Sequence, residues 1–279
     1  MQLNLNVKYI FLMLISFFIV TGCESSDERQ EQVNEPWNLI FEDDFNDDLS
    51  FWNVWYGGAF NEEIQLYRPE QLSIDNGILK INVQRENISG PTSIFDSAPK
   101  SFEYVSGRIE SKELFGPSNI DGNREIRFAA RIKLPFGHGM WPAFWSYDDP
   151  WPTQGEIDIL EARGGEPLEY QSNIFYGSTP NINTNQGTER VYEIGQDLTS
   201  AYHTYEMIWR SNSIDIIFDD QLLYTYQANN NNNINNLFDK KQKIVLNVAV
   251  GGIFFIDQNS NNYADSSTME IDWVKVYKR

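Results

Sequence analysis

The sequence is poor in cysteine and histidine. Its 279 residues include one Cys, Cys23, and two His, His138 and His203. A single thiol cannot form an internal disulfide, so packing alone must hold the fold together. Two imidazoles cannot build a three-histidine zinc site. The motifs of zinc proteases, serine hydrolases, P-loop NTPases and Rossmann dinucleotide-binding proteins are absent as well. The abundant reactive groups that remain are carboxyls.

Positive charge is also scarce. Lys and Arg number 21 against 40 Asp and Glu, which gives a formal net charge of -19. Nucleic-acid binding rests on cationic contacts with phosphate, so DNA and RNA are not expected partners. The 41% hydrophobic and 14% aromatic content is too high for a disordered acidic chain. We therefore expect a folded protein with a sizeable core.

No apolar run reaches the roughly 20 residues that a transmembrane helix needs. The longest, Tyr9 to Val20, has the length of a signal-peptide core. It leads into Val20-Thr21-Gly22-Cys23, which resembles the lipobox of bacterial lipoproteins. We interpret residues 1–22 as a lipoprotein signal peptide and Cys23 as the lipidated residue. The alternative is an ordinary secretory signal followed by an incidental cysteine.

Residues 23–36 are predicted to form an acidic flexible tether, because Val33 is almost the only apolar residue after Cys23. Ser26-Asp27-Glu28 resembles an acidic signal that directs some Gram-negative lipoproteins to the outer face of the cell. We expect an exported monomer whose only membrane contact is its lipid anchor. The outer membrane is the expected location, with the protein exposed at the cell surface.

Residues 37–279 are predicted to form one all-β domain. Apolar and polar residues alternate with period 2 in 79–83, 126–134 and 244–250, as in strands with one buried face. Turn sequences such as Asp75-Asn76-Gly77 separate such segments. No segment shows a convincing amphipathic helix. Two packed antiparallel sheets are favoured over a barrel.

One strand carries an unusual set of acids, in Gly155-Glu156-Ile157-Asp158-Ile159-Leu160-Glu161. Glu156 and Asp158 share one face. Strict alternation would place Leu160 beside them and turn Glu161 into the core. A β-bulge, which adds one residue to the strand, would return Glu161 to the acidic face. Because clustered carboxyls repel one another, such a cluster indicates function rather than stability.

Retaining glycoside hydrolysis is the reaction that such carboxyls suit best. It needs an ionised carboxylate as nucleophile and a protonated carboxyl as acid/base. Acidic edge strands and calcium sites can carry similar patterns. Nearby tryptophans favour a carbohydrate site, because sugar rings stack on indoles. We expect two of Trp141, Trp145 and Trp151 to contact substrate, with Trp145 as the packing residue.

An ordered series of motifs resembles glycoside hydrolase family 16, in its laminarinase-like branch. The series covers essentially the whole of residues 37–279. Its members are Phe41-Glu42-Asp43-Asp44-Phe45, Asn61-Glu62-Glu63-Ile64-Gln65, Val105-Ser106-Gly107-Arg108-Ile109, Arg131-Ile132-Lys133-Leu134-Pro135, Trp141-Pro142-Ala143-Phe144-Trp145, residues 155–161, His203-Thr204-Tyr205, Asn247-Val248-Ala249-Val250-Gly251-Gly252 and Ile271-Asp272-Trp273-Val274-Lys275-Val276-Tyr277.

This resemblance implies a β-jelly-roll sandwich whose concave sheet forms an open cleft for a polysaccharide, with endo-acting, retaining cleavage. Glu156 would be the nucleophile, Asp158 its helper and Glu161 the acid/base. The implied substrate-binding residues are Asn61, Arg108, Trp141 and Trp151. No cofactor would be needed for catalysis. A structural calcium is implied at Asp272, with backbone carbonyls near Glu42 and Gly77, as hard oxygen ligands.

The chain departs from the family pattern at Phe175, where a histidine is usual. The change replaces a hydrogen-bond donor with an apolar ring and leaves the substrate open. An endo-β-1,3-glucanase acting on laminarin-like glucan is the leading reading. The same family could instead act on mixed-linkage glucan or on agar, porphyran or carrageenan, although the net negative charge disfavours polyanions. A non-catalytic glucan-binding surface lipoprotein is the third hypothesis.

Overall fold

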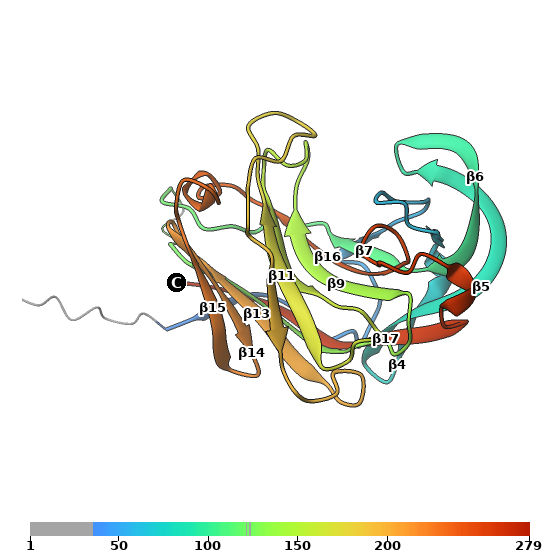
Figure 1. Cartoon of the computed structure of the whole chain (residues 1–279). Helices are drawn as coiled ribbons and strands as arrows, with labels where there is room; N and C mark the ends of the chain where they lie inside the picture. Colours follow the sequence, from blue (N-terminus) through green and yellow to red (C-terminus); the bar gives the residue numbers. More distant parts are fainter. Residues whose placement is uncertain (1–35, 121, 123) are drawn as a thin grey trace, which may run out of the picture. The chain divides into compact units, whose positions relative to one another are not determined.

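The computed structural model describes residues 36–120, 122 and 124–279 (Figure 1). The predicted signal peptide, Cys23 and nearly all of the tether lie outside the described residues. Within them, helical structure is limited to three short 3-10 segments: η1 Pro69–Gln71, η2 Ile234–Asn236 and η3 Ser260–Asn262. A search of the same part of the chain finds no helix long and apolar enough to span a membrane.

A ten-stranded sheet forms one layer. Its strands follow the order β15-β14-β13-β8-β17-β5-β6-β3, with β1 paired to β17 and β4 paired to β5. The bounds are β1 Asn38–Asp43, β3 Gln65–Tyr67, β4 Leu72–Asp75, β5 Ile78–Ser93, β6 Asp96–Ser106, β8 Ile126–Lys133, β13 His203–Trp209, β14 Ser213–Phe218, β15 Gln221–Gln227 and β17 Ser266–Lys278.

A seven-stranded sheet forms the second layer and carries the predicted site. Its order is β12-β11-β10-β9-β16-β7-β2. The bounds are β2 Trp52–Val54, β7 Arg108–Ser111, β9 Met140–Tyr147, β10 Glu156–Glu161, β11 Glu169–Phe175, β12 Arg190–Glu193 and β16 Lys243–Val250. Strand β10 is therefore near the middle of the sheet, with β9 and β11 on either side.

Both sheets are antiparallel apart from the short pair of β3 and β6, which is parallel. Residues of η1, β4 and β5 separate these two strands in the chain. Such an intervening connection allows β3 to run in the same direction as β6 at the edge of the sheet. The prediction of an all-β sandwich built from two antiparallel sheets is confirmed.

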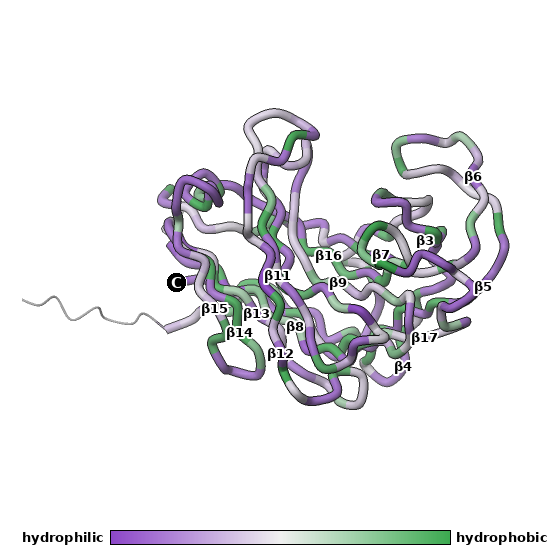
Figure 2. The backbone as a smooth tube through the Cα atoms, viewed as in Figure 1, coloured by the Kyte–Doolittle hydropathy of each residue, from purple (hydrophilic) through white to green (hydrophobic). Residues whose placement is uncertain are grey.

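The core lies between the sheets, and strand alternation explains which residues enter it. On β8, Phe128, Ala130 and Ile132 are buried in the core, and so are Leu246 and Val248 on β16. Figure 2 shows apolar and polar stretches alternating along the strands of both layers. One face of the seven-stranded sheet therefore packs on the core, and we call its opposite face the outer face.

Candidate active site

Strand β10 contains the predicted bulge. Opposite β9, Asp158 pairs with Trp145 and Leu160 pairs with Phe144, so Ile159 is an extra residue with no counterpart. The register of β10 with β11 also shifts between Asp158 and Glu161. The side chains of Ile159 and Leu160 both enter the core. This bulge restores the strand phase, so the prediction from the sequence is confirmed.

The bulge also shortens the distance along the strand between the two glutamates. Glu156 pairs with Tyr147 and Glu161 pairs with Ala143. Five residue steps on β10 therefore match four on β9. At about 3.4 Å per residue, this removes roughly 3 Å from the separation of the two positions.

Each glutamate accepts a hydrogen bond from an indole. Trp151 Nε1 donates to Glu156 Oε2 at 2.9 Å. Trp141 Nε1 donates to Glu161 Oε1, also at 2.9 Å. An N–H donor favours the ionised form of a carboxyl group. The structure thus brings four of the predicted site residues together as two matched pairs.

Burial raises the pKa of all three acids on this face. It raises the pKa of Glu156 to about 8, with the nearby charge of Glu161 as the second cause. It raises the pKa of Glu161 to about 7, opposed by the Trp141 N–H. Burial and then the two glutamates raise the pKa of Asp158, whose side chain is almost fully enclosed. At neutral pH the cluster can hold a proton and a negative charge at once.

The expectation that Trp145 packs in the core is wrong. Its neighbour Phe144 faces the core, whereas Trp145 lies half-buried on the outer face opposite Asp158. The Trp145 ring stacks on Tyr147, with centroids 4.8 Å apart. Trp141, which shares this face, is only 8% exposed. Alternation places residues 141, 143 and 145 on one face, and the structure shows that this is the face of the acids.

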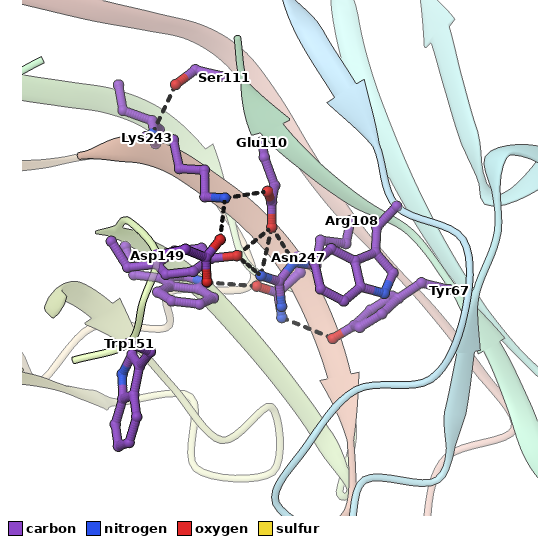
Figure 3. A network of polar contacts seen from close by, with 12 residues as sticks. Tyr67, Arg108, Glu110, Ser111, Asp149, Trp151, Lys243 and Asn247 are labelled. Carbon is purple, nitrogen blue, oxygen red and sulfur yellow. Dashed lines mark hydrogen bonds and ion pairs between the residues drawn. The ribbon is translucent and has the colours of Figure 1, made fainter. Parts of the chain in front are cut away.

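Arg108 lies in a buried polar network on the same face (Figure 3). Its Nη2 and Nε donate to Glu110 Oε1 at 2.6 and 3.1 Å. Its guanidinium group lies 4.1 Å from the centroid of the Trp55 ring. Lys243 Nζ joins Glu110 to Asp149 at 3.2 and 3.3 Å. Arg108 is therefore already partnered, and its role in binding sugar stays a prediction.

Asn61 lies outside the strands, on exposed backbone with a left-handed φ of 60°. Its side chain favours the ionised form of the Glu63 carboxyl group. Glu63 accepts a bond from Gln65 Nε2 at 2.6 Å, and burial raises its pKa to about 7. Arg108 acts electrostatically on both Glu63 and Glu156. Asn61 thus reaches the predicted site through charged neighbours, while its contact with substrate stays a prediction.

Sequence reasoning missed two polar residues of this face. Asn247 accepts a bond from Trp145 Nε1 at 2.8 Å and donates to the Tyr67 hydroxyl at 3.0 Å. Gln171 pairs in register with Glu161, and its side chain favours the ionised form of that carboxyl group. A signal existed for Asn247, because it is the one polar residue within the apolar run of β16 after Lys243. Gln171 carried no comparable signal, since its partner depends on strand pairing.

Phe175 lies directly beside the acids. It pairs with Glu156 across β10 and β11, and its ring centroid is 6.2 Å from that of Trp151. The apolar ring at this position therefore borders both Glu156 and the indole that binds it.

The residues predicted to hold calcium lie in and beside the other sheet, and their side chains give the metal little support. Asp272 forms an ion pair with Arg131, and Glu42 forms one with Lys275 at 3.0 Å. No group of three or more His, Cys, Asp or Glu suited to a metal occurs within the described residues. Backbone carbonyls could still contribute, so the calcium site stays a prediction.

The chain matches known proteins over most of its length. The family model described as "Glycosyl hydrolases family 16" matches residues 65–275. "Glucan endo-1,3-beta-glucosidase A1" of Niallia circulans is 31% identical over 91% of this chain. "Glucan endo-1,3-beta-glucosidase" of Cryptopygus antarcticus is 32% identical over 86% of this chain. The chain spans 40% of the length of the first relative and 92% of the second.

A solved structure shows the same fold. It is an endo-β-1,3-glucanase from Pyrococcus furiosus, which is 27% identical to this chain and superposes with a TM-score of 0.72. The likeness covers 87% of this chain and 94% of that one. It agrees with the predicted jelly-roll sandwich.

Proposed function

Since the chain belongs to family 16 of the glycosyl hydrolases, we propose that it cleaves internal bonds of β-1,3-glucan, of the laminarin type, with retention of configuration. The observation that carries this proposal is the outer face of β10. There a bulge gathers three carboxyls, and each glutamate accepts an indole N–H. The endo-β-1,3-glucanase names of its relatives support the linkage and the substrate.

The two glutamates share a proton, and the reactive form of the pair carries it on Glu161. In the first step, the ionised Glu156 attacks the anomeric carbon of the sugar. The bond from that carbon to the glycosidic oxygen breaks, and Glu161 gives its proton to the departing oxygen. A covalent glycosyl ester of Glu156 results. Trp151 N–H stabilises negative charge on Glu156 before the attack and again when the ester breaks.

In the second step, Glu161 takes a proton from water, and the water oxygen attacks the anomeric carbon and displaces Glu156. Asp158 lies between the two glutamates on the same face and titrates with them. We assign it the role of orienting Glu156 and sharing its proton during the cycle. The carboxyls and water suffice for this chemistry, so it requires no cofactor.

The proposal is tested by measuring reducing-sugar release from laminarin, mixed-linkage glucan, agarose, porphyran and carrageenan. Release from laminarin in the form of oligosaccharides is expected. Release from a galactan alone would keep the mechanism and change the substrate. Glucan binding without release from any polymer would favour the glucan-binding protein instead.

We expect a bell-shaped dependence of kcat/KM on pH, with its optimum near neutrality. The pKa values raised to about 8 for Glu156 and about 7 for Glu161 belong to an interacting pair, so each limb describes the pair. Activity falls on the acidic side as the pair gains a second proton, and on the alkaline side as it loses its last one. Initial rates at low substrate concentration measure the profile. Two limbs near the ordinary carboxyl value of 4.5 would contradict it.

We also propose that the protein is an exported monomer anchored by a lipid on Cys23, in the outer membrane and facing the surface. The support is the apolar run before Cys23 and the acidic segment after it. Labelling cells with an alkyne fatty acid should tag the unchanged protein, whereas a Cys23→Ser variant should be untagged. Equal labelling of both forms would contradict the proposal.

A further inference from the structure

A small aromatic cluster on the outer face is separate from the main core. It comprises Trp141 on β9, Ala249 on β16, and Phe255, with Phe254 packed against it. Both phenylalanines follow β16 in the segment 251–257, which we call the β16 loop. The cluster meets the predicted site at Trp141, whose indole N–H is bound to Glu161.

Phe254 controls the orientation of the Trp141 ring. The two rings stack nearly parallel, with centroids 4.3 Å apart and an interplanar angle of 9°. An indole stacked in this way can rotate only by giving up the contact. The direction of the Trp141 N–H, and therefore its bond to Glu161, depends on where Phe254 lies.

Arg163 holds Phe254 at both its main chain and its ring. Nε and Nη2 of Arg163 donate to the Phe254 carbonyl oxygen at 3.1 and 3.0 Å. The guanidinium carbon lies 3.9 Å from the centroid of the Phe254 ring. Such a planar fork fixes geometry in a way that a lysine cannot reproduce. Arg163 lies two residues after Glu161, the last residue of β10, so adjacent positions of the chain supply both the acid and the group that organises its partner.

We propose that Arg163 and Phe254 are positioning residues, which hold the Trp141 N–H on Glu161 and thereby control proton delivery to the glycosidic oxygen. This inference rests on the proposed function, in which Glu161 is the acid/base. It gives Trp141 a role that differs from sugar stacking, since Phe254 already covers one face of its ring.

Several charged groups act on Glu161, and they decide which variants are informative. Glu156 and Asp158 lie on its own strand and interact with it. Arg163 favours the ionised form of Glu161, and Glu189 opposes it. Arg163 also lies 3.9 Å from Glu166. Removing the Arg163 charge would change the electrostatics of Glu161 and the position of Phe254 at the same time. The informative variants are therefore Phe254→Ala and Arg163→Lys, which leave that charge in place.

The experiment measures kcat, KM and pH profiles on laminarin and on an aryl β-glucoside oligomer whose phenolate leaves without a proton. Phe254→Ala is expected to lower kcat on laminarin about tenfold or more. Its alkaline limb should move to higher pH, because a lost N–H donor raises the pKa of Glu161. Release of the phenolate should stay close to that of the unchanged protein. Phe254→Tyr should keep the kcat on laminarin and the alkaline limb of the unchanged protein. Arg163→Lys should lower kcat and shift the alkaline limb in the same directions as Phe254→Ala, by smaller amounts.

Ile256→Ala is the matched control, because Ile256 is fully exposed in the same loop. It should leave every parameter unchanged. Equal losses on both substrates, or an unmoved alkaline limb in Phe254→Ala, would overturn the inference. Thermal melting of each variant identifies any loss that comes from unfolding.

A second readout does not depend on activity. The ¹⁵N indole signal of Trp141, assigned with Trp141→Phe, should titrate with Glu161 in the unchanged protein and lose that response in Phe254→Ala. An intact response in Phe254→Ala would refute the positioning role. Failure of the unchanged protein to cleave any glucan would refute the proposed function. The indole titration would still show whether Phe254 holds the Trp141 N–H on Glu161.

Discussion

Glu156→Ala is expected to abolish glucan hydrolysis, with a loss of about four orders of magnitude or more in kcat. No other carboxyl can replace it as nucleophile, because Asp158 is nearly fully enclosed and Glu161 is needed as the acid. The fold should persist, since Glu156 projects from the outer face rather than into the core. Removal of one of three crowded carboxyls should also relieve repulsion, so the melting temperature should not fall.

When azide restores activity to Glu156→Ala, the stereochemistry of the product identifies the nucleophile. In Glu156→Ala, azide can enter the space of the lost carboxylate and attack a substrate that carries a good leaving group. One displacement inverts the anomeric carbon, so an α-glycosyl azide is expected. The product is identified by proton NMR. A β-glycosyl azide from this variant would show that Glu156 is the acid/base and would reverse the two assignments.

Glu161→Gln is expected to slow laminarin cleavage by about 10² to 10⁴-fold, the usual contribution of a positioned acid. Glutamine keeps the size of the side chain and can still meet Trp141, yet it carries no proton to give. The first step on a substrate with a dinitrophenolate leaving group should be nearly unaffected, since that group departs unprotonated. The alkaline limb of the pH profile should disappear, because the variant no longer has an acid that can lose its proton as the pH rises.

Azide rescue of an acid/base variant, Glu161→Ala, is the control for azide rescue of the nucleophile variant, Glu156→Ala. Azide added to Glu161→Ala should react with the covalent intermediate and give a β-glycosyl azide, after two displacements. A substitution that merely disturbed the site would give neither product pattern. An equal loss on laminarin and on the dinitrophenyl substrate would show that Glu161 does not deliver the proton.

Much of the catalytic strand could be predicted from the sequence, because a break in alternation is visible in a single segment. Leu160 and Glu161 occupy the wrong phase for a regular strand, and only an extra residue corrects it. The sandwich followed from period-2 patterns in the same way. These features are local, so no knowledge of the partner strands was needed.

The partners of the acids could not be predicted so well. The indole bonds to Glu156 and Glu161 depend on side-chain rotamers and on a loop that returns to the sheet. The sequence shows that Trp141 and Trp145 share a face, but which face meets the core depends on the pairing of β9 with β10. The position of Gln171 opposite Glu161 likewise follows from register. Pairing across strands is decided by the whole fold rather than by a segment.

Because of the bulge in β10, the number of residues in the acidic motif does not by itself determine where the three acids lie. Five steps along β10 occupy four positions of β9, so a strand with one residue fewer between Asp158 and Glu161 would alternate regularly and still present three acids at the same positions. The additional residue contributes a second aliphatic side chain to the core, since Ile159 and Leu160 both enter it. The placement of the acids in the sheet therefore depends on paired positions and not on the number of residues between them. Chains with either spacing could share one catalytic geometry and differ only in how the layer beneath is filled.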